Sequence, residues 1–295
     1  MAVGRPDDRS GASVLRPLPV VHRQLVDDPS DPRLDGFRGL RDPDLRRSLE
    51  TAHGLFVAEG VAVVGRLVRS PYPPAAVAVT PEREGDVCAE LAGVAGLGEV
   101  PLLVVPRPVL DVVAGFPVHR GVLALGERHP LLSIADLGPE SRTVVVLEEC
   151  NDHENMGAIA RTARALGADA MVLSPRCADP LYRRSVRVSM GEILRLPLVA
   201  ADWWPDALEE LRAAGFRVLA LTPAGSVDLA DVVIGLDDRV AVLLGAEGPG
   251  LSPAALAAAD ERVRIDIRDG VDSLNVGHAA AVALHHVATA RRGTS

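Results

Sequence analysis

The second half of this chain of 295 residues alternates short apolar runs with amphipathic stretches of helical length. Its first apolar run, TVVVLEE (143–149), is continuous rather than alternating, which is typical of a strand buried on both faces of a sheet. Further runs that predict strands are AMVLS, LPLVA, RVLALT, VAVLLG and RVRIDI. Strands that alternate with helices form parallel sheets covered on both faces. The sequence therefore predicts an α/β fold whose ligands bind at the carboxyl ends of the strands.

The helices predicted between these strands are amphipathic. The first begins at about Met156 and presents a core-facing side made of Met156, Ile159, Ala160, Ala163 and Leu166. Arg161 lies roughly opposite that side and is not expected in the core. The others are predicted in LYRRSVRVSMG, WWPDALEELRAAG and VGHAAAVALHHVATARR.

The first half of the chain predicts a smaller α/β domain. The strands are expected in AAVAVT, PLLVVP and GVLALG, the helices in VAVVGRLVRS and GDVCAELAGVA, and a short helix running into a strand in DPDLRRSLETAHGLFVAEG. Residues 1–18 are polar and lack periodicity, so they are expected to form a disordered leader. Residues 127–142 are expected to be a linker. The predicted domains are therefore 19–126 and 143–295.

Every basic side chain other than histidine in this chain is arginine, because the sequence contains no lysine. This excludes a P-loop lysine, a Schiff base and a lysine nucleophile. The net charge of −9 is no indication of nucleic-acid binding. Any contact with RNA must then come from local clusters of arginine.

Cysteine usage and hydropathy point to a cytoplasmic protein. Cys88, Cys150 and Cys177 are scattered without a CxxC pair, which favours reduced, buried thiols over disulfides or a zinc site. The chain has neither a run of about 18 uncharged apolar residues nor a signal-peptide segment. His285 and His286 are neighbours on a predicted helix and cannot face the same way, so no metal site is expected.

Several familiar catalytic patterns do not occur in this sequence. The glycines of GAEGPG follow G-x-x-G-x-G rather than the G-x-G-x-x-G of a dinucleotide site. GxxxxGK[ST], HExxH and GxSxG are all missing. Hydride transfer, phosphoryl transfer, zinc hydrolysis and serine hydrolysis are therefore disfavoured.

Three polar segments containing glycine each begin with an apolar run. They are LEECNDHENMGAIARTARALGA (147–168), LLGAEGPGLS (243–252) and IDIRDGVDSLNVGHAAA (265–281). Loops at one edge of a parallel sheet converge, so these three are expected to build one site. The polar groups of this expected site are Asn155, Arg161, Glu247, Ser273 and Asn275.

Each of these five side chains also has a purely structural interpretation. Asn155 is suited to cap its helix, and Ser273 and Asn275 are suited to cap the last helix. Arg161 could be a solvated helix residue, and Glu247 could be a carboxylate in a glycine-rich turn. Their joint arrangement favours the functional interpretation.

The segments NMGAIARTA (155–163), GAEGPGLS (245–252) and SLNV (273–276) resemble the three signature motifs of the SpoU/TrmH family. This family comprises RNA ribose 2′-O-methyltransferases of the SPOUT superfamily, and the order and spacing match over residues 143–290. In the first half, FVAEG (56–60) and HRGVLAL (119–125) resemble the L30e-like RNA-binding domain that many members carry. The sequence departs from the family at Gly277-His278, where Ser-Val is commoner, which puts the start of the last helix or a dimer contact in doubt.

The resemblance implies an enzyme that transfers a methyl group from S-adenosyl-L-methionine to a ribose 2′-hydroxyl of structured RNA, with rRNA favoured over tRNA. It implies a deep trefoil knot in the C-terminal domain and a homodimer formed through that domain, without a metal. Arg161 would be either the activating base or a clamp on the substrate phosphate, and arginine's permanent charge favours the clamp. Asn155, Glu247, Ser273 and Asn275 would be the other catalytic residues.

The resemblance also implies which residues hold the cofactor and the RNA. The cofactor pocket would be made by Leu221, Thr222, Gly245, Gly248, Ile265 and Leu274. Bare glycine backbone would let the adenine and ribose approach closely. RNA would be bound by Arg183, Arg184, Arg187, Arg46 and Arg47, with further candidates at Arg66 and Arg69.

Two alternatives to this function stay open at the level of sequence. One is a non-catalytic RNA-binding or ribosome-associated protein that keeps the same fold. The other is an rRNA methyltransferase that gives resistance to a ribosome-directed antibiotic.

Overall fold

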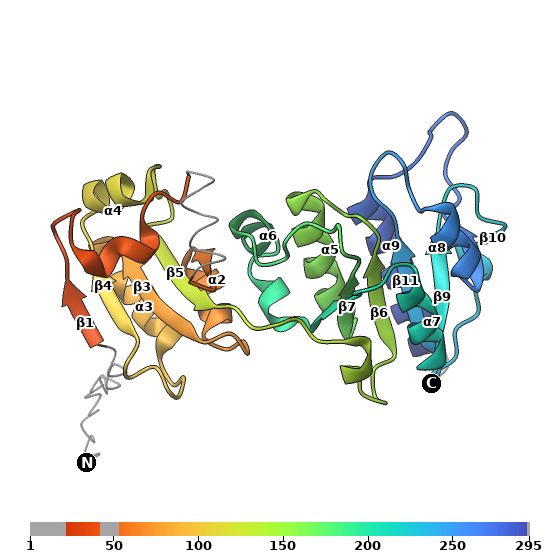
Figure 1. Cartoon of the computed structure of the whole chain (residues 1–295), viewed down its shortest axis with the longest axis horizontal. Helices are drawn as coiled ribbons and strands as arrows, with labels where there is room; N and C mark the ends of the chain where they lie inside the picture. Colours follow the sequence, from red (N-terminus) through yellow and green to blue (C-terminus); the bar gives the residue numbers. More distant parts are fainter. Residues whose placement is uncertain (1–21, 42–52, 294–295) are drawn as a thin grey trace, which may run out of the picture.

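The part of the chain that the structure describes forms two β-sheets, each covered by helices, and one connection joins them (Figure 1). The structure is a computed structural model and describes residues 22–41 and 53–293. The predicted leader at 1–18, the helix expected just after residue 41, and Arg46 and Arg47 lie outside the described residues. None of the helices within the described ranges has both the length and the apolar character needed to cross a membrane.

The larger sheet contains seven strands in the order β10-β12-β9-β11-β6-β7-β8, and every pairing in it is parallel. The bounds are β6 Thr143–Leu147, β7 Ala170–Leu173, β8 Leu198–Ala200, β9 Phe216–Leu221, β10 Val227–Asp228, β11 Arg239–Leu244 and β12 Glu261–Arg264. The predicted parallel α/β fold is confirmed. From β6 the chain adds β7 and β8 on one side, and the later strands lie on the other. The order therefore reverses between β6 and β11, which is where open α/β sheets bind ligands.

Alternate residues of the central strands fill two separate cores. Val145 and Leu147 of β6 point toward one core, and Val144 and Val146 point toward the other. The first core is closed by α5 His153–Ala165, α6 Arg183–Val188 and α9 Val276–Gly293, and the second by α7 Asp206–Ala213 and α8 Pro253–Ala258. Burial on both faces explains why β6 is a continuous apolar run.

The smaller sheet contains five strands in the order β1-β4-β3-β5-β2, with both parallel and antiparallel pairs. Its elements are β1 His22–Leu25, η1 Pro32–Phe37, β2 Leu55–Glu59, α2 Val61–Leu67, β3 Pro74–Val79, η2 Pro81–Arg83, α3 Glu84–Leu91, β4 Pro101–Val104, α4 Arg107–Ala114 and β5 Val122–Glu127. The sequence did not predict α4, which is short and rich in valine, a residue that favours strands. The resemblance of this region to an L30e-like domain stays a prediction.

The connection between the sheets, residues 128–142, is attached to the larger sheet. Leu132 forms a parallel bridge with Val199 of β8, and Ile134 in η3 Ile134–Asp136 is buried in the second core. The expected boundaries at 126 and 143 fall on either side of this segment. They stay a proposal, as does the trefoil knot.

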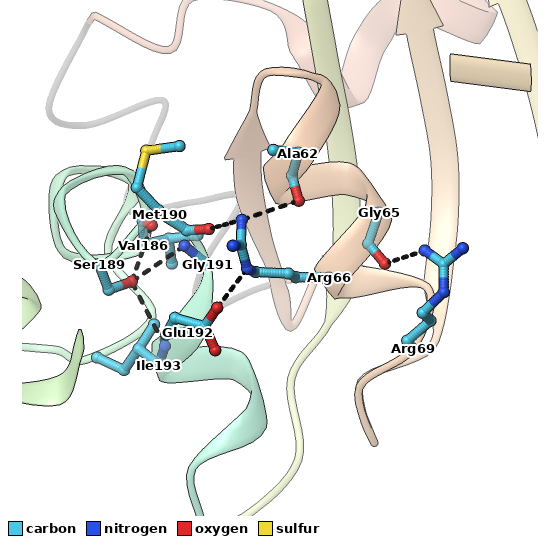
Figure 2. A network of polar contacts seen from close by, with 10 residues as sticks. All are labelled: Ala62, Gly65, Arg66, Arg69, Val186, Ser189, Met190, Gly191, Glu192 and Ile193. Carbon is cyan, nitrogen blue, oxygen red and sulfur yellow. Dashed lines mark hydrogen bonds and ion pairs between the residues drawn. The ribbon is translucent and has the colours of Figure 1, made fainter. Parts of the chain in front are cut away.

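The two sheets meet through α6 and the turn that follows it. Nη1 of Arg183 in α6 lies 3.3 Å from Oε2 of Glu59 at the end of β2. Arg66 of α2 donates to Glu192 of η4 Glu192–Arg195, as Figure 2 shows. Arg128 forms a two-bonded ion pair with Asp179, in which its Nη2 lies 2.6 Å from Oδ2. Apolar residues of both units belong to one continuous buried cluster. The contact between the units is therefore both apolar and ionic.

Helix α5 approaches α6 very closely at Gly157. A Cβ atom at this position would lie 2.6 Å from the carbonyl oxygen of Ser185 and 2.9 Å from Cβ of Val188. The glycine of the NMG segment is thus required by packing between helices. Because Gly157 has no side chain, α6 and the smaller unit attached to it can pack closely against the helix that carries Asn155 and Arg161.

We expect Gly157→Ala to lower the free energy of unfolding by about 1–3 kcal/mol, because the added methyl group overpacks the α5–α6 contact. Urea unfolding followed by circular dichroism measures the change. Gly85→Ala in α3 is the matched control, because its Cβ meets nothing within 4 Å. The control should be neutral or stabilised by up to about 1 kcal/mol. A Gly157→Ala protein as stable as the wild type would contradict the close approach.

Candidate functional site

Three polar side chains from the three glycine-containing segments meet at the carboxyl edge of the larger sheet. The side-chain amide of Asn275 donates to Oδ1 of Asn155 over 3.0 Å and to Oε1 of Glu247 over 2.5 Å. Asn155 follows β6, Glu247 follows β11 and Asn275 follows β12. The expected convergence of the loops is present for these three residues.

Asn155 is not the cap of its helix. Helix α5 begins at His153, earlier than expected, and the carboxylate of Asp152 accepts from the backbone N–H groups of Glu154 and Asn155, both over 2.8 Å. The interpretation of Asn155 as an N-cap is therefore wrong. Its side chain, on a residue only 9% exposed, is left to bond with Asn275.

Asn275 is both a cap and a bridge. Its Oδ1 accepts from the backbone N–H groups of Gly277 and His278, at 2.9 and 3.3 Å, which caps the first turn of α9. Its amide group is turned toward Asn155 and Glu247. The interpretation of Asn275 as a helix cap and its interpretation as a member of the polar site therefore both apply. The unusual Gly277 allows the arrangement, because a Cβ there would already lie 3.2 Å from Oδ1 of Asn275.

The loop that carries Glu247 folds back on itself between β11 and α8. Gly250 donates to the carbonyl of Ala246 over 3.1 Å, and Gly248 and Gly250 have φ angles of 89° and 69°, which favour glycine. A Cβ at Gly245 would lie 2.4 Å from the backbone carbon of Gly250. Gly245 is therefore required by the loop itself, a reason that differs from the expected approach of a ligand.

Arg161 and Ser273 do not join this trio. A rise of about 1.5 Å and a turn of about 100° per residue put Arg161 about 9 Å along α5 from Asn155 and about a third of a turn away. Arg161 is exposed, as expected, and lines a pocket with Arg66 and Glu192. Ser273 is exposed too, and no described residue forms a hydrogen bond with its side chain.

The residues expected to hold the cofactor lie at the ends of adjacent strands. Leu221 ends β9, and Ile265 directly follows β12, which pairs with β9. Both side chains are partly buried against the first core. Thr222 donates its backbone N–H to Val263 over 2.9 Å, and Leu274 is 38% exposed. An apolar ledge, partly open to solvent, is thus available beside the Gly245 loop.

A buried carboxylate that the sequence analysis missed holds this loop in place. Glu148, which follows β6, is 2% exposed and accepts from Nε1 of Trp204 over 2.6 Å and from the backbone N–H of Ser252 over 2.8 Å. Ser252 ends the Glu247 loop and caps α8 through its hydroxyl. Glu148 therefore fixes the far end of the loop to β6. The sequence feature that could have identified Glu148 is an acidic residue placed directly after a fully apolar run.

Most arginines expected to bind RNA already have partners. Arg183 lies near Glu59 and stacks over the ring of Phe116, with its guanidinium carbon 4.2 Å from the ring centre. Arg184 donates to Glu154, and Arg69 to Glu90. Arg187 is exposed, and none of the described residues pairs with it. Within the described residues, α6 therefore carries fewer exposed arginines without a carboxylate partner than the sequence predicts.

Cys150, which lies just before this site, is not available as a nucleophile. Burial, followed by the nearby thiol of Cys177, raises the pKa of Cys150 to about 12. The pKa of Cys177 is raised by burial as well. Both thiols are thus protonated at neutral pH. In the described part of the chain, His, Cys, Asp and Glu side chains form no group of three that could bind a metal ion.

Comparisons with known proteins point to one family. A model of the SpoU rRNA methylase family matches residues 142–285. A protein of Mycobacterium bovis, named as an uncharacterized tRNA/rRNA methyltransferase, is 47% identical over 264 residues, which cover 89% of this chain and 90% of that protein.

Solved structures show the same fold. The rRNA methyltransferase of Sinorhizobium meliloti with bound AdoMet is 26% identical, has a TM-score of 0.75 and covers 93% of this chain and 99% of that one. The SpoU methyltransferase AviRb of Streptomyces viridochromogenes, in complex with AdoMet, is 24% identical, with a TM-score of 0.74. That match covers 89% of this chain and all of AviRb, and supports the fold alone.

We expect Glu148→Ala to lower the free energy of unfolding by about 1–3 kcal/mol, because it leaves the indole N–H of Trp204 and the backbone N–H of Ser252 without an acceptor. Trp204→Phe is the partner variant. If the hydrogen bond couples the two residues, the double variant should be less destabilised than the sum of the single variants by at least about 0.5 kcal/mol. Strict additivity in urea unfolding would show that the bond contributes nothing.

Two substitutions of Asn275 separate the cap from the bridge. Asn275→Ala removes both and should cost about 1 kcal/mol or more of stability. Asn275→Asp keeps the acceptor for α9 but sets a second carboxylate against Glu247, which raises the pKa of the pair in the folded state. The loss of unfolding free energy caused by Asn275→Asp should therefore become smaller as the pH falls from about 7 to about 4. A deficit that does not change with pH would mean that the two side chains are apart.

Proposed function

Because this chain belongs to the SpoU family of RNA methyltransferases, we propose that it methylates a ribose 2′-hydroxyl of rRNA or tRNA with S-adenosyl-L-methionine as donor. The observation that carries the proposal is the contact of Asn275 with Asn155 and Glu247, which joins the three family motifs at one edge of the sheet. Such an edge, at the point where the strand order reverses, is the expected place for a ligand.

The chain offers a fitting place for the donor. Leu221 and Ile265 make a half-buried apolar ledge, and Val271 and Leu274 are 52% and 38% exposed in the loop that follows β12. An adenine ring would cover such apolar side chains, while backbone amides of the Gly245 and Ile265 loops would contact its polar atoms. When bound, S-adenosyl-L-methionine supplies an electrophilic methyl group on a sulfonium ion.

The remaining chemistry is the activation of the ribose hydroxyl, whose proton must leave as its oxygen attacks. Glu247 is an exposed carboxylate held in place by the amide of Asn275, so it is a suitable proton acceptor. Arg161 is a permanent cation by the nature of its side chain, so its role is to hold the neighbouring phosphate and to stabilise the alkoxide that develops. Asn155 orients Asn275 rather than Arg161.

Arg161 and the trio lie on different sides of α5 in one chain, and we propose that a homodimer brings them to one nucleotide. Apolar side chains are exposed around α9, namely Val282 on the helix and Val233 and Leu236 on the loop after η5 Leu229–Asp231. His286 of α9 forms a hydrogen bond with the carbonyl of Val232, so this loop lies against the helix. A second copy of the chain would cover this surface.

We expect Arg161→Ala to reduce methyl transfer by about 10²–10³-fold, the usual cost of losing one group that stabilises developing charge. Binding of S-adenosyl-L-methionine, measured by calorimetry, should stay within about twofold, because Arg161 lines the pocket with Arg66 and Glu192 and not the apolar ledge. Transfer of labelled methyl groups to total RNA from cells that lack the gene measures the activity, and nuclease mapping locates 2′-O-methyl groups. Arg212→Ala on α7, across the sheet, is the control.

Arg161→Lys distinguishes the two roles of this residue. Lysine keeps the positive charge but lacks the planar fork, so a clamp should retain a measurable part of the activity. An Arg161→Ala protein with most of its turnover would sink the assignment. Methylation on a base instead of a ribose would overturn the proposed reaction.

A further inference from the structure

An open pocket of about 400 Å³ lies where the smaller unit meets helix α5. It is lined by Arg66 of α2, by Arg161, Arg164 and Ala165 of α5, and by Glu192 of η4. Three arginines and one glutamate thus line a space larger than a single phosphate group. The pocket is separate from the contact between Asn155, Glu247 and Asn275.

The two arginines of α5 leave unsatisfied charge in this pocket. Arg161 and Arg164 are three residues apart, so they lie on the same side of the helix, where like charges repel each other. Both are exposed, and neither forms a hydrogen bond or an ion pair with any residue that the structure describes. A position in the last turn favours Arg164 through the helix dipole, but this does not account for Arg161. An anion between the two would remove their repulsion.

Arg66 is held at the wall of the pocket by the segment that follows α6. Its Nε donates to Oε1 of Glu192 over 2.6 Å, and its Nη1 donates to the carbonyl of Met190 over 2.9 Å (Figure 2). Within the described chain no acceptor is bonded to its Nη2. A cation from the smaller unit is therefore fixed in position beside the two arginines of α5.

The segment that holds Arg66 has an unusual backbone. Met190 and Gly191 are both left-handed, with φ angles of 56° and 83°, and Met190 is one of only two non-glycine residues with positive φ in the described chain. The buried hydroxyl of Ser189 donates to Val186 and accepts from Gly191 and Ile193, which stabilises this turn (Figure 2). Residues held in such conformations occur often at ligand-binding sites. Here the turn directs the Met190 carbonyl at Arg66.

We propose that this pocket binds an RNA phosphodiester group and that Arg66 and Arg164, flanking Arg161, are its ligands. Arginine forms paired hydrogen bonds with phosphate oxygens, and Nη2 of Arg66 and the guanidinium groups of Arg161 and Arg164, none of which is bonded to a described residue, supply the donors. Glu192 orients Arg66 and at the same time weakens the field of the pocket. The smaller unit thus contributes to the site through a single, positioned side chain. The inference rests on the proposed action on RNA and extends it to residues outside the three motifs.

Salt dependence of RNA binding tests the proposal. The probe is a fluorescein-labelled single-stranded oligoribonucleotide of mixed sequence, titrated with the full chain at several KCl concentrations. Each lost phosphate contact should reduce the slope of log K against log [KCl] by about 0.7. We expect this reduction for Arg164→Gln and for Arg66→Gln, together with about tenfold weaker binding at low salt. Arg212→Gln removes the same charge on α7 and should leave the slope unchanged.

Arg164→Gln and one further variant, Glu192→Gln, keep the test independent of folding. Arg164 has no bonded partner among the described residues, so Arg164→Gln removes no structural contact. Glu192→Gln retains an oxygen for Arg66 but removes the negative charge, and it should strengthen binding about threefold. A role of Glu192 that was only structural would weaken binding or leave it as it is. Unchanged slopes in both arginine variants, or weaker or unchanged binding by Glu192→Gln, would overturn the proposal.

The failure of this proposal can be told from the failure of the proposed function. Methyl transfer to total RNA is measured on the same variants. If the variants transfer methyl groups at the wild-type rate and their salt slopes are unaltered, the pocket proposal is wrong and the proposed methyl transfer stands. If the slopes are altered but the wild-type chain transfers no methyl group to RNA, the pocket proposal stands and the proposed reaction is wrong.

Discussion

The parallel pairing of β6 with β11 is the constraint on which the candidate site depends. It sets Val144 against Ala241 and continues to Leu147 against Leu244, so both strands end at the same level. The strand order reverses at this pair, so the loops after β6 and β11 leave side by side in the space where no crossover covers the sheet edge. Asn155 and Glu247 come together for this reason. The buried Glu148 then secures the second loop to the end of β6, and a carboxylate can remain there because two N–H groups satisfy it.

Helix α5 joins this edge to the rest of the molecule through three different faces. Its first turn offers Asn155 to Asn275, and its apolar side packs on the sheet through Met156, Ile159 and Ala163. Gly157 lets α6 approach, and α6 and the following turn hold the smaller unit by means of Arg183 and Arg66. Both units are therefore held in place by contacts that lead to α5. The pocket beside Arg66 and Arg161 is thus fixed to the same helix that carries Asn155 at its other end.

Much of the fold and part of the site could be predicted from local pattern. Continuous apolar runs located β6, β7, β9 and β11, and the family resemblance selected Asn155, Glu247 and Asn275. The valine-rich helix α4 and the two-residue strand β10 were missed because their local signals are weak or contradictory. Arg183, Arg184 and Arg66 were expected to bind RNA, but each lies beside a carboxylate. Their partners Glu59, Glu154 and Glu192 are distant in sequence, and only folding brings them near.

The sequence by itself determined the class of fold, the family and the three polar segments, because periodicity and motif spacing are properties of neighbouring residues. Tertiary structure alone decided what each side chain does. Asp152 rather than Asn155 caps α5, Asn275 both caps and bridges, and Arg161 faces the other unit instead of the trio. These outcomes depend on which donors and acceptors lie within about 3 Å of one another across distant segments. A distance of that kind is set by the packing of β6, β11 and α9 and is not written in any one stretch of the chain.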